Sequence, residues 1–155
     1  MATLSFERGT AFMESQLRLS FTLDKLIERA RTLVGFDGRP LIEDASVADK
    51  LGRLRGQVAA LRSMTYMGAS RASREALPGP EGTYIALMLA ELKQTVYRFY
   101  MELLGPAMLE LPPEGLTEEP VHQYLYGYAA TIGGGTSEVR RNIIAERVLG
   151  LPRHS

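Results

Sequence analysis

The chain has 155 residues, 45% of them hydrophobic, and its 18 basic residues balance its 18 acidic residues. This size fits one compact domain with a buried core, and the lack of a basic excess argues against a nucleic-acid partner. With no cysteine and only two histidines, the sequence excludes disulfides and favours no metal site. It also lacks a signal-peptide pattern and an apolar run of bilayer-spanning length, which predicts no membrane partner and a cytoplasmic location.

Two long helices are predicted in the first half of the chain. Apolar residues recur every three or four positions over residues 4 to about 34, with no proline among them, which is typical of an amphipathic helix. Residues 35–40 contain the glycines and the proline that end a helix. A second helix is predicted over about 45–74, because its apolar residues alternate steps of four and three.

A third helix is predicted over about 82–104, after the Pro-Gly-Pro break at 78–80. It is apolar on nearly all sides, which indicates a central helix or one that also meets another subunit. Its stripe of Tyr97, Tyr100, Met101 and Leu104 could line a ligand pocket, but such residues at helical spacing are more often core.

Two shorter helices are predicted near the C-terminus, over about 121–130 and 137–149. No segment alternates with the period of two that strands require. We therefore expect a single all-α domain spanning residues 1–155, an up-and-down four-helix bundle with an additional C-terminal helix pair.

A glycine-rich turn at 133–135 leads directly into the last predicted helix. Three glycines remove the side chains from the turn, so a ligand could approach the backbone N–H groups closely. Thr136 or Ser137 can cap the helix, and Glu138 in the first turn suits its dipole. Such an end can bind a phosphate or polar ring atoms. On local physics alone, the favoured interpretation is a glycine-rich connection with a hydroxyl cap.

Residues 132–153 read Ile-Gly-Gly-Gly-Thr-Ser-Glu-Val-Arg-Arg-Asn-Ile-Ile-Ala-Glu-Arg-Val-Leu-Gly-Leu-Pro-Arg. This run closely resembles the C-terminal signature of the acyl-CoA dehydrogenase family. The resemblance extends over almost the whole chain, but it covers only that family's C-terminal helical domain. It implies that the N-terminal helical and middle β-domains of a full-length member are absent. The chain is then expected to be a fragment or a truncated relative, inactive or nearly so by itself.

The resemblance also implies a reaction, the α,β-dehydrogenation of an acyl-CoA thioester, in which a carboxylate removes the α-proton and a hydride passes to FAD. In the commoner family layout the base is a glutamate directly before the Gly-Thr pair, but Gly134 occupies that position here. Other relatives carry the base near the start of the domain's first helix in a Leu-x-x-Glu-Arg context, which residues 4–8 match. Glu7 is therefore the candidate base, with a pKa raised by desolvation. The alternative is an ordinary first-turn acid favoured by the helix dipole.

The remaining site residues follow from the same resemblance. Phe6, Arg8 and Gly135 match positions near the substrate. Thr136, Ser137 and Glu138 match positions that line the flavin. The implied cofactor is FAD, and the implied partners are an acyl-CoA thioester, electron-transfer flavoprotein as electron acceptor, and other subunits in a homo- or hetero-oligomer, either dimer or tetramer.

Two flavin motifs of the family are altered in this chain. Its Gln-x-x-Gly-Gly loop corresponds to residues 102–106, where Glu102 would repel a pyrophosphate and Pro106 lacks an N–H donor. Its Arg-x-Thr-Phe-Gly segment survives only loosely at 31–35. Such changes resemble actinobacterial acyl-CoA dehydrogenases of steroid side chains, in which two different subunits share sites. The competing hypothesis is a non-catalytic helical oligomerisation module with the same fold.

Overall fold

The computed structural model describes residues 2–74, 81–105 and 120–152, and within the first helix it describes side chains from Phe12 onward. Within these ranges, five α-helices follow one another, with two short 3-10 turns between them. They are α1 (Ala2–Thr32), η1 (Leu41–Glu43), α2 (Ala45–Ala72), α3 (Glu81–Leu104), α4 (Pro120–Gly127), η3 (Tyr128–Thr131) and α5 (Ser137–Arg147). Extended pairing within the described ranges is confined to one isolated bridge, between Val34 and Pro40. The all-α architecture expected from the sequence is confirmed.

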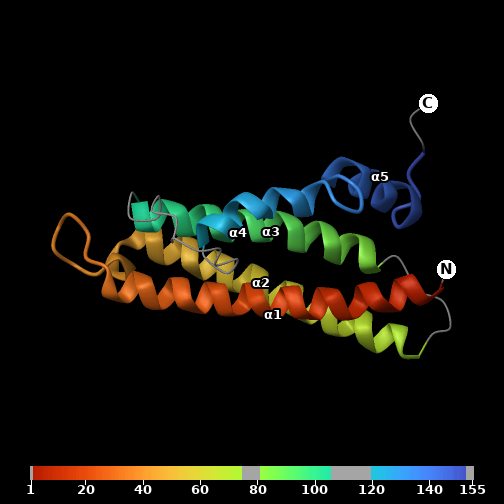
Figure 1. Cartoon of the computed structure of the whole chain (residues 1–155), viewed down its shortest axis with the longest axis horizontal. Coiled ribbons are helices and arrows are strands. Elements are labelled where there is room, and N and C mark those ends of the chain that lie inside the picture. The colour runs from red at the N-terminus through yellow and green to blue at the C-terminus, as the bar shows by residue number, and fades with distance from the viewer. Residues whose placement is uncertain (1, 75–80, 106–119, 153–155) are drawn as a thin grey trace.

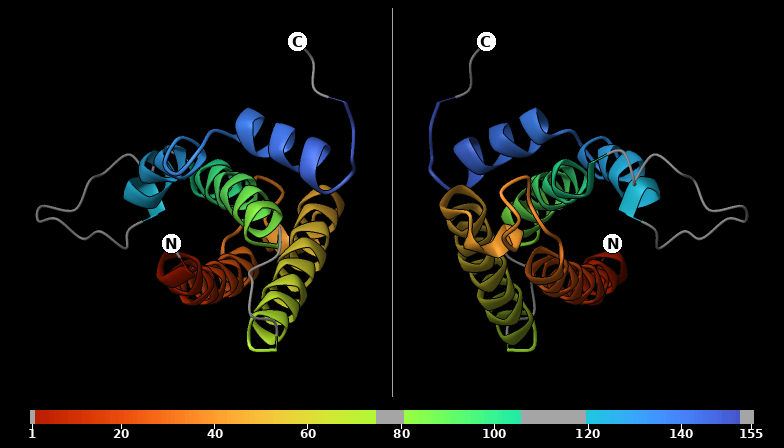
Figure 2. Two further views of the ribbon diagram at one scale, coloured as in Figure 1. Left: turned by 90° about the vertical axis from the view of Figure 1, so that its right-hand side faces the viewer. Right: turned by 90° about the vertical axis from the view of Figure 1, so that its left-hand side faces the viewer.

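The helices α1, α2, α3 and α4 run alternately up and down, and α4 lies along α3 as the short fourth member (Figure 1). The last helix, α5, packs on the other end of α3, near the end of the bundle where α1 begins (Figures 1 and 2). This arrangement brings the start of the chain and the glycine-rich turn to the same end of the molecule.

The core lies between α1, α2 and α3. Its buried members recur every three or four residues on each helix, which places them on one face. They are Leu19, Leu23, Leu26, Ala30, Leu51, Leu54, Val58, Leu61, Ile85, Leu89, Leu92, Val96, Phe99 and Tyr100. Burying each large apolar side chain contributes about 1.5–3 kcal/mol. Tyr97 is buried as well, so the core assignment of the stripe on α3 is confirmed for its two tyrosines, while Leu104 is only partly buried against the core and Met101 is only partly buried.

Specific polar contacts define the helix ends. Asp44 caps α2, since its carboxylate accepts hydrogen bonds from the backbone N–H groups of Ser46 at 2.8 Å and Val47 at 3.1 Å. The Ser46 hydroxyl donates a further bond, and these contacts lower the pKa of Asp44. An ion pair between Arg71 and the buried Glu81 joins the end of α2 to the start of α3. Each helix in the described ranges is too short or too polar to cross a bilayer.

Candidate active site

The glycine-rich turn that connects η3 to α5 depends on its glycines for backbone geometry. Gly134 has φ of 71° and Gly135 has φ of 113°, a region that side-chain-bearing residues rarely occupy. At Gly133, an added Cβ would stand 3.1 Å from the carbonyl oxygen of Ala129, which is closer than most Cβ contacts. Glycine therefore fits all three positions with the least strain.

Arg140 holds this turn in place from inside. Its side chain is buried in the first part of α5, and its guanidinium donates to the carbonyl oxygens of Ala130 at 3.2 Å and Gly133 at 2.8 Å. Sequence reasoning missed this role, because Arg140 and Arg141 are adjacent and look alike. Arg141 is exposed instead and pairs with Glu91 of α3.

The start of α5 is capped as the sequence predicts. Thr136 is the N-cap, and its hydroxyl oxygen accepts a hydrogen bond from the Val139 N–H at 3.3 Å. The exposed Glu138 carboxylate accepts hydrogen bonds from its own backbone N–H and from the Thr136 hydroxyl, and these bonds lower its pKa. Ser137 is buried in the same turn. Glu138 is thus an ionised acid at the positive end of the helix.

A cleft of about 310 Å³ lies beside the turn and is shared by α1, α3, α4, η3 and α5. Its lining is mostly apolar, with two hydroxyl groups, one ammonium group and one guanidinium group. The lining residues are Phe12, Ser15, Ala86, Leu89, Ala90, Lys93, Tyr126, Ala129, Ala130, Gly133 and Arg140. One wall of the cleft is formed by Phe12 and Ser15 of α1, and another by Gly133 of the glycine-rich turn.

Lys93 is the unexpected member of this lining. It is half-buried on α3, with its Nζ 5.5 Å from the ring centre of Tyr126 and 6.0 Å from that of Tyr97. Burial lowers the pKa of Lys93, and the positive charge of Arg18 lowers it further. The sequence shows only a lysine within an apolar helix, and such a lysine usually faces water.

The structure describes the side chains of only some of the residues expected at the site. Gly135, Thr136, Ser137 and Glu138 lie in the turn and the first turn of α5. The other three, Phe6, Glu7 and Arg8, belong to α1, but their side chains lie outside the described residues.

In the two altered flavin motifs, at 102–106 and 31–35, the described polar side chains bond within the domain. Lys50 of α2 donates to the Glu102 carboxylate at 2.7 Å and also lies 4.2 Å from the ring centre of Phe99, so a basic partner offsets the negative charge of Glu102. Pro106 lies outside the described residues. Near the end of α1, the Thr32 hydroxyl donates to carbonyl oxygens one turn earlier on its own helix.

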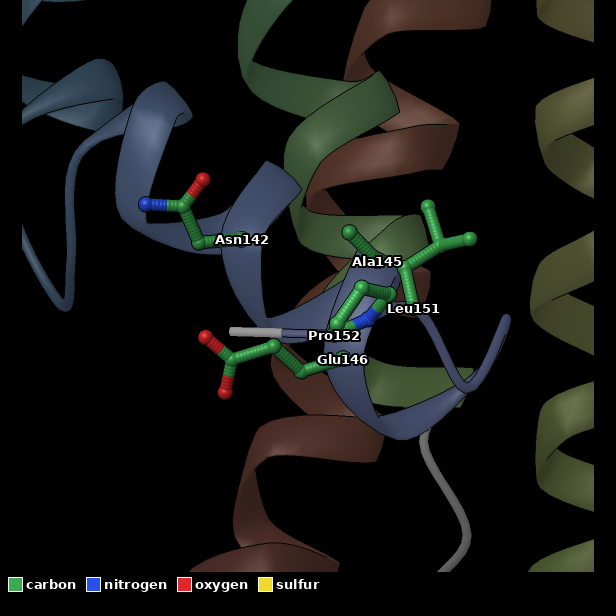
Figure 3. A pocket seen from close by; sticks show the side chains of 5 residues that line it. All are labelled: Asn142, Ala145, Glu146, Leu151 and Pro152. Atoms are coloured by element: carbon green, nitrogen blue, oxygen red, sulfur yellow. The ribbon is translucent and has the colours of Figure 1, made fainter. Parts of the chain in front are cut away.

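A second hollow, of about 290 Å³, lies where the chain folds back over the end of α5 (Figure 3). Its lining residues are Asn142, Ala145, Glu146, Leu151 and Pro152. A hydrogen bond of 2.9 Å from the Leu151 N–H to the Ala145 carbonyl oxygen holds the C-terminal segment against α5. None of the site residues expected from the sequence lines it.

Residues 1–149 match the family described as acyl-CoA dehydrogenase, C-terminal domain. The chain belongs to the acyl-CoA dehydrogenase family. Acyl-CoA dehydrogenase IpdE1 from Mycobacterium tuberculosis is 34% identical over 156 residues, which cover 100% of this chain and 38% of that relative.

Solved structures of this family share the fold. The ChsE4-ChsE5 complex from Mycobacterium tuberculosis superposes with a TM-score of 0.74 at 28% identity, covering 90% of this chain and 37% of the other. The Tcur3481-Tcur3483 steroid ACAD gives a TM-score of 0.81 at 23% identity, covering 97% and 38%. The acyl-CoA dehydrogenase domain seen here thus spans less than two fifths of the length of these relatives.

Proposed function

We propose that this chain forms the C-terminal helical part of a flavin-dependent acyl-CoA dehydrogenase that oxidises the Cα–Cβ bond of an acyl-CoA thioester. The observation that carries the proposal is the cleft, in which the wall from α1 meets the signature turn of the family. Its volume of about 310 Å³ is at the lower end of the range of about 300–1,000 Å³ for small-molecule sites.

The base that removes the α-proton is proposed to be Glu7. Gly134 has no side chain and a positive φ, so the turn itself offers no proton acceptor at this position. Glu7 lies in α1 five residues before Phe12, or about 7.5 Å along the helix axis, and Phe12 is part of the cleft wall. Desolvation by Phe6 and the acyl chain would raise the pKa of Glu7 towards the range of a useful base, and Arg8 would orient its carboxylate.

The cofactor is proposed to be FAD, which when bound supplies the acceptor for the β-hydride. The turn leaves room for a flat ring, because Gly133 and Gly134 are exposed and carry no side chain just before the positive end of α5, while the Gly133 N–H and carbonyl are bonded within the turn. Thr136, Ser137 and Glu138 would hold the flavin, and Gly135 would border the substrate. The Thr136 cap and the Arg140 bonds fix the shape of this surface before a ligand arrives.

The working enzyme is proposed to be an oligomer, a dimer or tetramer of like or unlike subunits, that passes its electrons to electron-transfer flavoprotein. Two related structures are named as pairs, ChsE4-ChsE5 and Tcur3481-Tcur3483. Large apolar side chains are exposed on α4 and in the turn, where Leu125 is 61% and Ile132 is 68% exposed. We infer that these exposed side chains contact other protein in the assembly.

The test is to produce the chain together with the remaining domains as an FAD-loaded enzyme and to compare Glu7→Gln with Glu14→Gln. Glu14 is a matched control, an exposed acid on the same helix that pairs with Arg18 at 3.0 Å. We expect Glu7→Gln to lower acyl-CoA-dependent acceptor reduction roughly 100- to 10,000-fold with unchanged FAD content. Glu14→Gln should leave turnover within about twofold, as expected for a surface ion pair.

The second candidate, a non-catalytic oligomerisation module, is supported by the same exposed residues on α4. It predicts that the assembled protein binds no FAD and reduces no acceptor, while substitutions of Leu125 and Ile132 by Ser break the assembly. Full turnover in Glu7→Gln would instead support an enzyme whose base is a residue other than Glu7.

A further inference from the structure

The charge of Lys93 distinguishes the cleft from the rest of the surface. Several cations of the described helices pair with acids across helices, as in Lys50 with Glu102, Arg55 with Asp24 and Arg141 with Glu91. Lys93 is half-buried, yet no carboxylate among the described side chains lies within ion-pairing distance of it.

The surroundings of Lys93 leave its charge incompletely balanced. The rings of Tyr126 and Tyr97 give cation–π contacts at 5.5 and 6.0 Å, near the outer limit for such contacts. Arg18, which pairs with Glu14 at 3.0 Å, is close enough to lower the pKa of Lys93, and the Arg140 guanidinium, on the same cleft, is already bonded to two carbonyl oxygens. A half-buried ammonium group in this position favours an anionic ligand, because the low local dielectric strengthens the attraction.

We propose that Lys93 binds a carboxylate at the far end of the acyl group, so that the enzyme takes acyl-CoA thioesters that carry a second, terminal carboxylate. This inference rests on the proposed function and names its substrate class. Phe12 and Leu89 offer apolar walls for the methylene groups between the two ends. The hydroxyl of Ser15, on the α1 wall, can donate a hydrogen bond to the same carboxylate. Lys93 is thus a specificity residue, and it takes no part in proton or hydride transfer.

The experiment uses the FAD-loaded enzyme with all its domains and two thioesters of equal chain length, suberyl-CoA and octanoyl-CoA. Lys93→Met keeps the length of the side chain and removes its charge. Lys25→Met is the matched control, a lysine on the exposed face of α1. Both kcat/KM and the dissociation constant by calorimetry are measured, so a catalytically inactive enzyme still reports on binding.

We expect the wild-type enzyme to prefer suberyl-CoA, and Lys93→Met to weaken its kcat/KM and its binding on the order of tenfold or more. Octanoyl-CoA should change less than about twofold in Lys93→Met, and Lys25→Met should leave both substrates unchanged. Lys93→Arg should retain part of the preference.

Two outcomes overturn the inference: equal losses on both thioesters in Lys93→Met, or no preference for suberyl-CoA in the wild type. Equal losses would mean that Lys93 pairs with a carboxylate from the rest of the enzyme. Failure of the proposed function looks different, since neither thioester would then reduce the flavin in the wild type, whatever stands at position 93.

Discussion

The core of the bundle and the glycine-rich corner at 132–140 are stabilised in different ways. Leu23, Leu26 and Leu61 are completely buried, and the hydrophobic effect that holds them is non-directional. The corner depends instead on the positive φ of its glycines, the Thr136 cap and the two bonds from Arg140. A core position accepts several apolar residues of similar volume, whereas the corner depends on particular backbone angles and hydrogen bonds that fewer residue types provide. This difference explains why the corner carries a readable family signature while the core shows only periodicity.

The largest expected effect is in the core, where Leu26→Ala removes a completely buried side chain between α1 and its neighbours. We expect a loss of about 2–5 kcal/mol in the free energy of unfolding, because transfer and cavity costs add. Guanidinium titration followed by circular dichroism measures it. The adjacent exposed Lys25→Ala should stay within about 0.5 kcal/mol. A loss below about 1 kcal/mol for Leu26→Ala would contradict the close packing described here.

A smaller and more local effect is expected at the corner. Arg140→Ala leaves the carbonyl oxygens of Ala130 and Gly133 without their charged donor, at a cost of about 1–3 kcal/mol. Amide hydrogen exchange should accelerate over residues 129–139 and stay slow in the α1–α2 core. Arg141→Ala, which breaks only an exposed ion pair, should cost about 0–1 kcal/mol. If the amide protection of the two variants were the same, Arg140 would not be the residue that supports the turn from inside.

The smallest effect concerns pH. The folded-state pKa of Glu138 lies below its ordinary value of 4.5, so its ionised form stabilises the start of α5. That stabilisation is fully present above pH 4.5 and is lost as the pH falls through the folded-state pKa. The thermal unfolding midpoint should therefore fall slightly more between pH 7 and pH 3 for the wild type than for Glu138→Gln. A larger fall in Glu138→Gln would reverse the sign and contradict the capping geometry.

Local sequence patterns predicted much of the fold. The periodicity over about 45–74 and 82–104 came within a few residues of α2 (Ala45–Ala72) and α3 (Glu81–Leu104), because apolar spacing and helix-ending residues are local properties. The Thr136 cap was predictable for the same reason. The burial of Arg140 and the position of Lys93 were not, since both depend on how helices far apart in the sequence rotate against one another. Glu7 stays a prediction.

By itself, the sequence determined an all-helical chain, a glycine-rich turn before the last helix, and membership of the acyl-CoA dehydrogenase family. Only the tertiary structure decided that Arg140 rather than Arg141 supports the turn, and that α1 and the turn border one cleft containing Lys93. The physical reason is that hydrogen bonding and side-chain spacing act over a few neighbouring residues. The face that each helix turns inward is set by the packing of the whole bundle.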